Sequence, residues 1–404
     1  MNLQGQIDRC DAEFVEGWLL NPDQPDHRIV LQVMSGDTLI GECRADNFRK
    51  DLRDARFGDG SCAFQFKFPT RLAHGAVPGV RLRIVGTPAF LLAASPDGAT
   101  RPQPAAVSAF GHLWFDRGDF VDEIGARHRR GVLDEEQCAQ LFRFVRDGFL
   151  IIPNAVPPRA ITALNDEIDR IWAHPPEGLM METFEPNDAM RYARPELRLR
   201  DGRTKLLDPY ACSEVVRRAT AAGPVTKFLS AVFGAQPKAF QQAAFWRGSQ
   251  QPMHKDSAYV KVASNPLAMA ATWLALEDIV PGAGELEYFV GSHRAPDFLF
   301  GGTSKWMHEH TGDHDRFLAS IMQDAETFGH RRGSFLARAG DVLIYHADLA
   351  NAVAGVTRTN ATRRSLLTHF TSADDQPGYR AAGSALAEMQ AQNCIFVSEF
   401  APVV

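Results

Sequence analysis

The chain has 404 residues, of which 45% are hydrophobic, and its 43 basic and 49 acidic side chains leave a formal charge of −6. This length allows two or three domains, and the negative balance argues against a broad electrostatic footprint for nucleic acid. The first residues lack a basic segment followed by an apolar stretch, and no run of about 18 apolar residues occurs. We therefore expect a cytoplasmic protein without a membrane span. Its six scattered cysteines are expected to be reduced thiols: Cys10, Cys43, Cys62, Cys138, Cys212 and Cys394.

Residues 1–95 contain short alternating runs of apolar and polar residues separated by turn signals, which is typical of a β-sandwich. Three of these runs predict strands: Ile29–Val33, Phe64–Phe68 and Val80–Val85. A stretch rich in proline, alanine and serine follows, and we place a linker at 96–108. The second domain is then expected at 109–404.

Helical patterns precede the candidate chemistry. Leu133–Gly148 has apolar residues at helical spacing, acids in its first turn and glycine at its end. Phe149–Pro153 predicts a short buried strand, and Arg159–Trp172 predicts a second amphipathic helix. Strands and turns dominate from about residue 238, with one further helix expected near Asp313–Thr327.

His254 and Asp256 form a His-x-Asp pair. Near a strand, such a pair places both side chains on one face, because positions i and i+2 point the same way. Lys255 then faces away from them, which suits contact with substrate or solvent rather than with a metal. A histidine and a carboxylate on one face are two ligands of the facial triad that non-heme Fe(II) oxygenases complete with a second histidine.

Five motifs in chain order include or follow this pair: Phe245–Tyr259, Thr272–Asp278, Gly284–Arg294, Gly340–His346 and Thr362–Phe370. The segment Asp147–Asn154 precedes them. Together they resemble the phytanoyl-CoA dioxygenase family of Fe(II)/2-oxoglutarate oxygenases, over a stretch from about Phe142 to Phe370. The resemblance implies a protein that is mainly β with some α, with a double-stranded β-helix of the jelly-roll type and flanking helices.

The resemblance also assigns roles to residues. His254 and Asp256 match two iron ligands, and Arg363 matches the arginine that pairs with the distal carboxylate of 2-oxoglutarate, for which a planar guanidinium offers bidentate geometry. Ser365 is a candidate donor to the same carboxylate. Trp273 is either a wall of the cosubstrate pocket or plain core. No role is expected for six other histidines: His293, His308, His310, His314, His330 and His369.

The chain departs from the family pattern at Asn351, which stands where the third iron ligand, a histidine, is expected. An asparagine carbonyl is a harder and weaker ligand than imidazole, so iron affinity should fall. His346 lies five residues earlier, about 16 Å along an extended strand and on the opposite face, which disfavours it as a substitute. Asp348 is nearer, but it would give a set of one histidine and two carboxylates that has no precedent in the family.

These observations predict an Fe(II)/2-oxoglutarate-dependent hydroxylase of a small-molecule or glycan-type substrate, with its competence limited by Asn351. The glycan suggestion comes from Gly17–Asp23, which is similar to β-rich accessory domains beside bacterial glycosyltransferases. Two alternatives stay open. One is a catalytically silent relative that binds a sugar or acidic metabolite, and the other is an oxygenase with water or an anion at the vacant ligand position. Retention of Asp256 argues against a halogenase.

Overall fold

A computed structural model describes residues 4–22, 24–35, 38–71, 80–85, 90–91, 108–117, 120–184, 190–200, 204–307, 311–378 and 388–399. The predicted linker at 96–108 lies outside these ranges except for Ser108. Internal contacts divide the chain into two units, one of Met1–Pro102 with Gly118–Phe142, the other of Gln103–Arg117 with Arg143–Val404. The predicted domain limits of 1–95 and 109–404 differ from these limits and stay a prediction.

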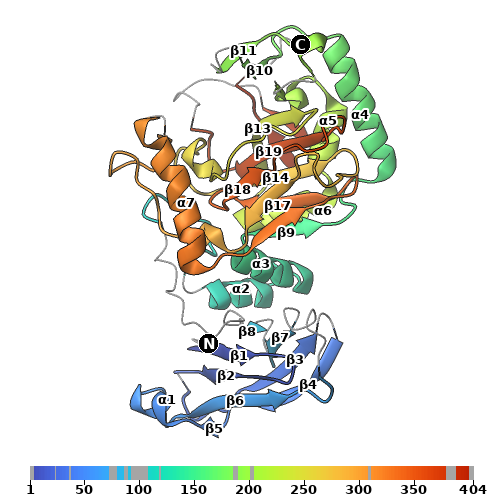
Figure 1. Cartoon of the computed structure of the whole chain (residues 1–404). Helices are drawn as coiled ribbons and strands as arrows, with labels where there is room; N and C mark the ends of the chain where they lie inside the picture. The colour runs from blue at the N-terminus through green and yellow to red at the C-terminus, as the bar shows by residue number, and fades with distance from the viewer. Residues whose placement is uncertain are drawn as a thin grey trace. The chain divides into compact units, whose positions relative to one another are not determined.

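The first unit contains two four-stranded antiparallel sheets (Figure 1). One has the order β1-β2-β6-β5 and the other the order β4-β3-β7-β8. The strands are β1 (Gln4–Cys10), β2 (Phe14–Leu20), β3 (Val30–Ser35), β4 (Thr38–Arg44), β5 (Asn47–Phe48), β6 (Ser61–Lys67), β7 (Val80–Ile84) and β8 (Phe90–Leu91), with α1 (Lys50–Asp54) before β6. Alternate residues such as Val15, Leu31 and Leu82 are buried, as expected for strands that cover an apolar core.

The described helices after β8 are α2 (Phe120–Arg129), α3 (Glu135–Asp147), α4 (Pro158–Ala173), α5 (Glu214–Thr220), α6 (Gly223–Phe233) and α7 (His314–Phe328). α2 belongs to the first unit, and α4 to α7 belong to the second. The stripe of Ile161, Leu164 and Ile168 on α4 is buried, in agreement with its periodicity.

A ten-stranded sheet forms the centre of the second unit. Its main path runs β11 (Met190–Ala193), β10 (Met181–Phe184), β12 (Lys205–Leu207), β13 (Pro237–Phe245), β19 (Ser365–Ser372), β14 (Met269–Ala275), β17 (Val342–His346) and β9 (Phe149–Ile152). In Figure 1, strands β13, β19, β14, β17 and β9 lie next to one another in this order. Neighbours along this path are antiparallel. The short β20 (Met389–Ala391) pairs with β21 (Cys394–Phe396), which runs parallel to β13.

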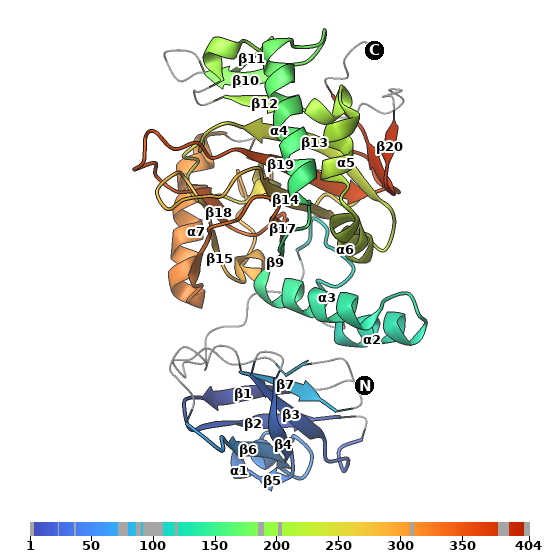
Figure 2. The same cartoon turned by 90° about the vertical axis from the view of Figure 1, so that its right-hand side faces the viewer.

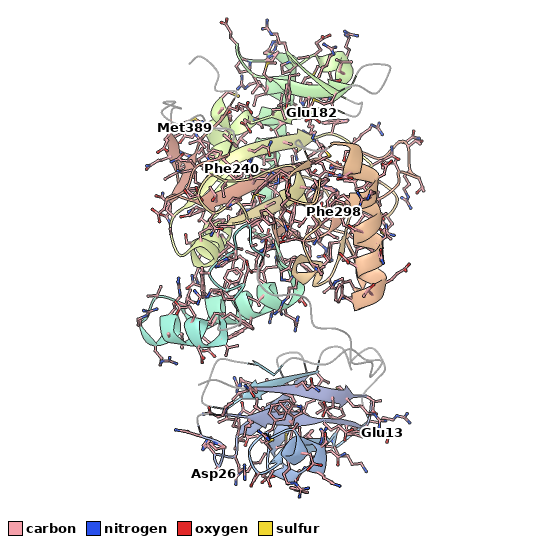
Figure 3. The ribbon with its side chains drawn as sticks, turned by 90° about the vertical axis from the view of Figure 1, so that its left-hand side faces the viewer. Glu13, Asp26, Glu182, Phe240, Phe298 and Met389 are labelled. Atoms are coloured by element: carbon pink, nitrogen blue, oxygen red, sulfur yellow. The ribbon has the colours of Figure 1, made fainter. Side chains whose placement is uncertain are left out.

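A three-stranded antiparallel sheet, in the order β16 (Arg332–Phe335), β15 (Leu286–Phe289) and β18 (Asn351–Val353), lies apart from the large one. Its residues Leu286, Tyr288 and Phe335 share a buried cluster with Trp273 and Leu343 of the large sheet. Helix α7 packs through Phe317 and Ile321 into a second cluster that includes residues of β15 and β18, and Figure 2 shows it beside these strands. In Figure 3, Phe298 lies near this helix, and its ring centroid is 5.6 Å from that of Phe317.

The local predictions for 133–153, 159–172 and 313–327 are confirmed by α3, β9, α4 and α7, and the chain is β-rich with helices. All six cysteines are free. Among the described residues, no helix is long and apolar enough to cross a membrane.

Candidate active site

Two residues far apart in sequence, His254 and Asn351, are fixed side by side by their backbones. They form an antiparallel bridge in which each backbone N–H donates to the carbonyl of the other, both at 2.8 Å. Asn351 begins β18, and Asp256 begins a short 3₁₀ turn that ends at Ala258. The structure therefore brings His254, Asp256 and Asn351 together, all of them buried.

The Asp256 carboxylate is contacted on both oxygens. Its Oδ1 lies 3.0 Å from Asn351 Nδ2 and 3.3 Å from His254 Nε2. Its Oδ2 accepts a hydrogen bond of 2.8 Å from the Tyr345 hydroxyl and lies 2.9 Å from His369 Nε2. One oxygen thus faces His254 and Asn351, while Tyr345 and His369 hold the other.

The pKa of Asp256 reflects these contacts. Burial alone raises the pKa of this carboxyl, but hydrogen bonds and charge from His254 and His369 bring it well below its usual value. Burial and the adjacent Asp256 raise the pKa of Tyr345 well above its usual range. Asp256 is therefore an ionised carboxylate, and Tyr345 is a neutral donor to it.

His254 presents its second ring nitrogen, Nε2, to that carboxylate. Its Nδ1 lies 2.8 Å from the Pro252 carbonyl, an acceptor, which places a hydrogen on Nδ1 and directs Nε2 toward Asp256. Nε2 and Asp256 Oδ1 are 3.3 Å apart, so they share a cation, either a proton or a metal ion. This pair fits two ligands of a metal site.

Asn351 presents its amide nitrogen to the site. Nδ2 donates to Asp256 Oδ1 at 3.0 Å and to the Leu349 carbonyl at 3.2 Å. A flipped amide would place its oxygen against these two acceptors, so the network sets the orientation. Within the described residues, no group of three His, Cys, Asp or Glu side chains is arranged to hold a metal. The residues present therefore fit a metal with two protein ligands, and they do not form the three-residue set.

Arg363 is 1% exposed and lies among polar and aromatic neighbours. Its Nε donates to the Gly284 carbonyl and its Nη1 to Ser365 Oγ, both at 2.8 Å, and its Cζ is 5.3 Å from the Trp273 ring. Burial lowers the pKa of this guanidinium to about 10. No carboxylate of the described residues pairs with it, and a buried cation without a counter-ion is costly. A carboxylate ligand such as 2-oxoglutarate fits this position. Trp273 belongs to the core as well as to this wall.

The alternative ligands considered for the third position are engaged elsewhere. His346 Nε2 lies 3.2 Å from Asp116 Oδ2, and both line a separate polar cavity of about 180 Å³. Asp348 accepts from Ser257 Oγ and pairs with Lys305 Nζ at 2.8 Å. Lys255 is only 6% exposed, so of the two expected contacts the one with solvent is wrong, because burial encloses its side chain, and the one with substrate stays a prediction.

Tyr345 and His369 were missed by the sequence interpretation. His369 follows Ser365 by four positions on β19, so period two places both side chains on the same face of the strand. That signal was present in the sequence. Tyr345 carries no comparable local signal, because only the pairing of β17 with β14 brings it toward Asp256.

Comparison with known proteins now decides the family. The family model for phytanoyl-CoA dioxygenase matches residues 144–365, which is more than half of the chain and includes all the predicted site residues. The chain belongs to the phytanoyl-CoA dioxygenase family. The predicted resemblance is confirmed, and so, at the level of the family, is the prediction of Fe(II) and 2-oxoglutarate as cofactors.

Several solved structures are similar to this member of the family. The epimerase SnoN in complex with Fe³⁺, alpha ketoglutarate and nogalamycin RO is 17% identical over 67% of this chain and 96% of its own, with a TM-score of 0.46. The carbocyclase SnoK, from nogalamycin biosynthesis, is 17% identical over 60% and 85%, with a TM-score of 0.45. EctD from S. alaskensis with bound Fe is 16% identical over 58% and 75%, with a TM-score of 0.42. No curated protein matches the sequence.

Proposed function

We propose that the protein is an Fe(II)/2-oxoglutarate-dependent hydroxylase whose iron is held by His254 and Asp256 alone. The observation that carries this proposal is that β19 joins the two parts of the site, since Ser365 accepts from Arg363 and His369 contacts Asp256, whose Oδ1 is 3.3 Å from His254 Nε2. The antiparallel strands that carry these residues support a double-stranded β-helix. Iron and 2-oxoglutarate together supply the oxidising chemistry that inserts oxygen into a C–H bond.

The protein's own residues bind and orient. Arg363 and Ser365 hold the distal carboxylate of 2-oxoglutarate against Trp273, which excludes water from that end of the pocket. Tyr345 and His369 fix the Asp256 carboxylate so that Oδ1 faces His254. A small-molecule substrate is expected, and the glycan class stays a proposal based on residues 17–23, as does the cytoplasmic location.

A second candidate function is a binding module without turnover. The observation that favours it is the Asn351 amide, which occupies Asp256 Oδ1 with a hydrogen bond and so satisfies the carboxylate without a metal. Arg363 would then hold an acidic metabolite with no oxidation following.

Anaerobic Fe(II) titration by calorimetry, with and without 2-oxoglutarate, separates the two. For the hydroxylase we expect iron binding that 2-oxoglutarate strengthens, and at least tenfold tighter binding in Asn351→His, which supplies a third nitrogen ligand. His346→Asn is the matched control, because this histidine pairs with Asp116 and should leave iron affinity unchanged. Iron binding that appears only in Asn351→His would establish the binding module instead.

A further inference from the structure

A second, larger cavity of about 630 Å³ adjoins the candidate site. Two of its lining residues touch the site directly. The Tyr259 ring packs edge-on to His254, with centroids 5.6 Å apart, and the Phe245 ring lies 5.5 Å from Arg363 Cζ. A molecule in this cavity therefore lies one side chain away from both the predicted iron ligand and the 2-oxoglutarate arginine. The volume is that of an ordinary small-molecule site.

Apolar atoms make up the larger part of the surface of this cavity, but most of its lining residues also carry a polar group. Three of the twelve, Phe245, Pro252 and Met307, are purely apolar. The others bear carboxylate, amide, hydroxyl, imidazole, ammonium or guanidinium groups. A long hydrocarbon would cover the remaining donors of Arg247 with atoms that cannot accept a hydrogen bond, which costs binding free energy. The cavity therefore favours a substrate that combines apolar and polar groups over an acyl chain.

Most charged and hydrogen-bonding groups of the lining already have partners. Lys205 of β12 pairs with Glu182 of β10 at 2.8 Å, and Glu182 is labelled in Figure 3. The Tyr259 hydroxyl lies 2.9 Å from His314 Nε2. Within the described residues, Arg247 is the charged group of the cavity without an oppositely charged partner.

Arg247 is held in place from one side. Its Nη1 donates to the carbonyls of Thr359 (2.5 Å) and Ala361 (3.0 Å), which fixes the plane of the guanidinium. Beside it, Gln250 adopts a φ of +54°, a left-handed conformation that costs free energy for this residue type, and it accepts from the Val356 backbone N–H. The loop is thus shaped to present Arg247 to the cavity with donors to spare.

We propose that the substrate is a small polar molecule with one anionic group, a carboxylate or a phosphate, and that Arg247 binds this group. The inference rests on the proposed function in that the cavity is taken as the substrate site of the same reaction. Arg247 is then a specificity residue, and the mixed polar and apolar lining binds the rest of the substrate. The anion is anchored beside the site, which places a carbon of the substrate toward His254.

Binding of matched probes tests this proposal. The full chain is saturated with 2-oxoglutarate, without iron, and titrated by calorimetry with glucose, glucuronate and glucose 6-phosphate. We expect at least one acid to bind tenfold or more tightly than glucose, and Arg247→Gln to reduce that preference to under threefold. Arg247→Lys keeps the positive charge and should retain part of the preference for the acid. Arg218→Gln, at an exposed arginine of α5, is the control and should change nothing.

The outcomes are distinct. Preference for glucuronate indicates a carboxylate substrate, and preference for glucose 6-phosphate a phosphate. The proposal is overturned when neither acid binds more tightly than glucose, or when the preference survives in an Arg247→Gln protein that melts at the wild-type temperature. Since no iron is present, this result is independent of whether the chain is a hydroxylase, which the iron titration decides separately.

Discussion

Asp256 is a carboxylate whose two oxygens have different tasks. Oδ2 is bound by Tyr345 and His369, which leaves Oδ1 to face His254 and Asn351. Because these contacts already fix the Asp256 side chain, it loses less rotamer entropy when it binds a metal. Groups that orient metal ligands commonly change metal affinity by about 10- to 100-fold.

Tyr345→Phe should therefore weaken iron binding roughly tenfold in the presence of 2-oxoglutarate, because Asp256 Oδ2 loses its neutral donor. The measurement is anaerobic calorimetry. Tyr288→Phe is the matched control, since this buried tyrosine lies in the same core cluster and makes no hydrogen bond through its phenol to the described residues. Equal iron affinities in the two variants would exclude an orienting role for Tyr345.

Arg363 and Arg364 offer a matched pair for cosubstrate binding. Arg363 is buried beside Ser365, whereas Arg364 bonds Asp169 at 2.9 Å. Arg363→Lys should weaken 2-oxoglutarate binding by at least tenfold, because an ammonium cannot reproduce the planar bidentate fork. Arg364→Lys should leave it within twofold of wild type. Calorimetric titration with 2-oxoglutarate measures both, and similar losses in the two variants would contradict the assignment of Arg363.

At the residue scale, the sequence was sufficient to predict site residues that lie close together along the chain. His254 and Asp256 are two positions apart, and so are Arg363 and Ser365, so this spacing identified each pair, although Asp256 lies in a 3₁₀ turn and Arg363 lies just before β19. The orientation of the Asn351 amide was not predictable, because it depends on the Leu349 carbonyl and on Asp256, which is 95 positions earlier.

At the element scale, the turn from α3 into β9 depends on Gly148. Its φ is +81°, and a Cβ added there would lie 2.5 Å from His293 Nδ1 and 2.8 Å from Leu349 Cδ1. The backbone conformation is left-handed, and the space beside it is filled. This glycine therefore allows the helix to end directly before an edge strand of the large sheet.

Gly148→Ala should lower the free energy of unfolding by roughly 2–3 kcal/mol, from left-handed strain and from steric overlap. Gly302→Ala separates the two contributions, because Gly302 has a φ of +76° and no atom within 4 Å of an added Cβ. The Gly302→Ala change should lower the free energy of unfolding by about 1 kcal/mol. Urea denaturation measures both, and equal losses would show that the contacts of Gly148 are readily displaced.

The elements themselves were largely predictable, but their order in the sheet was not. Apolar periodicity and the end glycine indicated α3, and the apolar run indicated β9. However, Tyr345 of β17 and His369 of β19 both lie opposite Ala271 of β14, one on each side. That arrangement sets β14 between two strands that follow it in the chain, and no local pattern encodes such a neighbour relation.

At the scale of the whole molecule, the buried carboxyl group of Asp208 couples folding to pH. Burial raises its pKa to about 7 from an ordinary 3.8, although Ser398 Oγ and the Gln242 N–H, both at 2.6 Å, partly offset this. Between these two pKa values the folded protein keeps a proton that the unfolded chain has released. The free energy of unfolding therefore falls as pH rises from about 4 to 7.

Asp208→Asn should abolish this contribution and stabilise the protein above pH 7, by up to roughly 4 kcal/mol. The amide oxygen can still accept from Gln242 and its NH₂ group can donate to Ser398. Asp374→Asn, at an exposed position, should leave the pH profile unchanged. Chemical denaturation at several pH values measures the effect, and a variant that is no more stable at pH 8 than wild type would refute it.

The last described strand has a consequence for how the protein is made. β21 lies parallel to β13, Val397 N–H donates to the Ala239 carbonyl, and the Tyr210 hydroxyl donates to the Val397 carbonyl at 2.6 Å. A parallel neighbour this distant in sequence can join only after residues 394–398 have left the ribosome. Until then, the nascent protein carries Lys238 and Ala239 of β13 without this strand partner and Asp208 without Ser398. Synthesis of residues 394–398 is thus the step that closes the large sheet, and a chain that stops earlier offers an open strand edge to other chains.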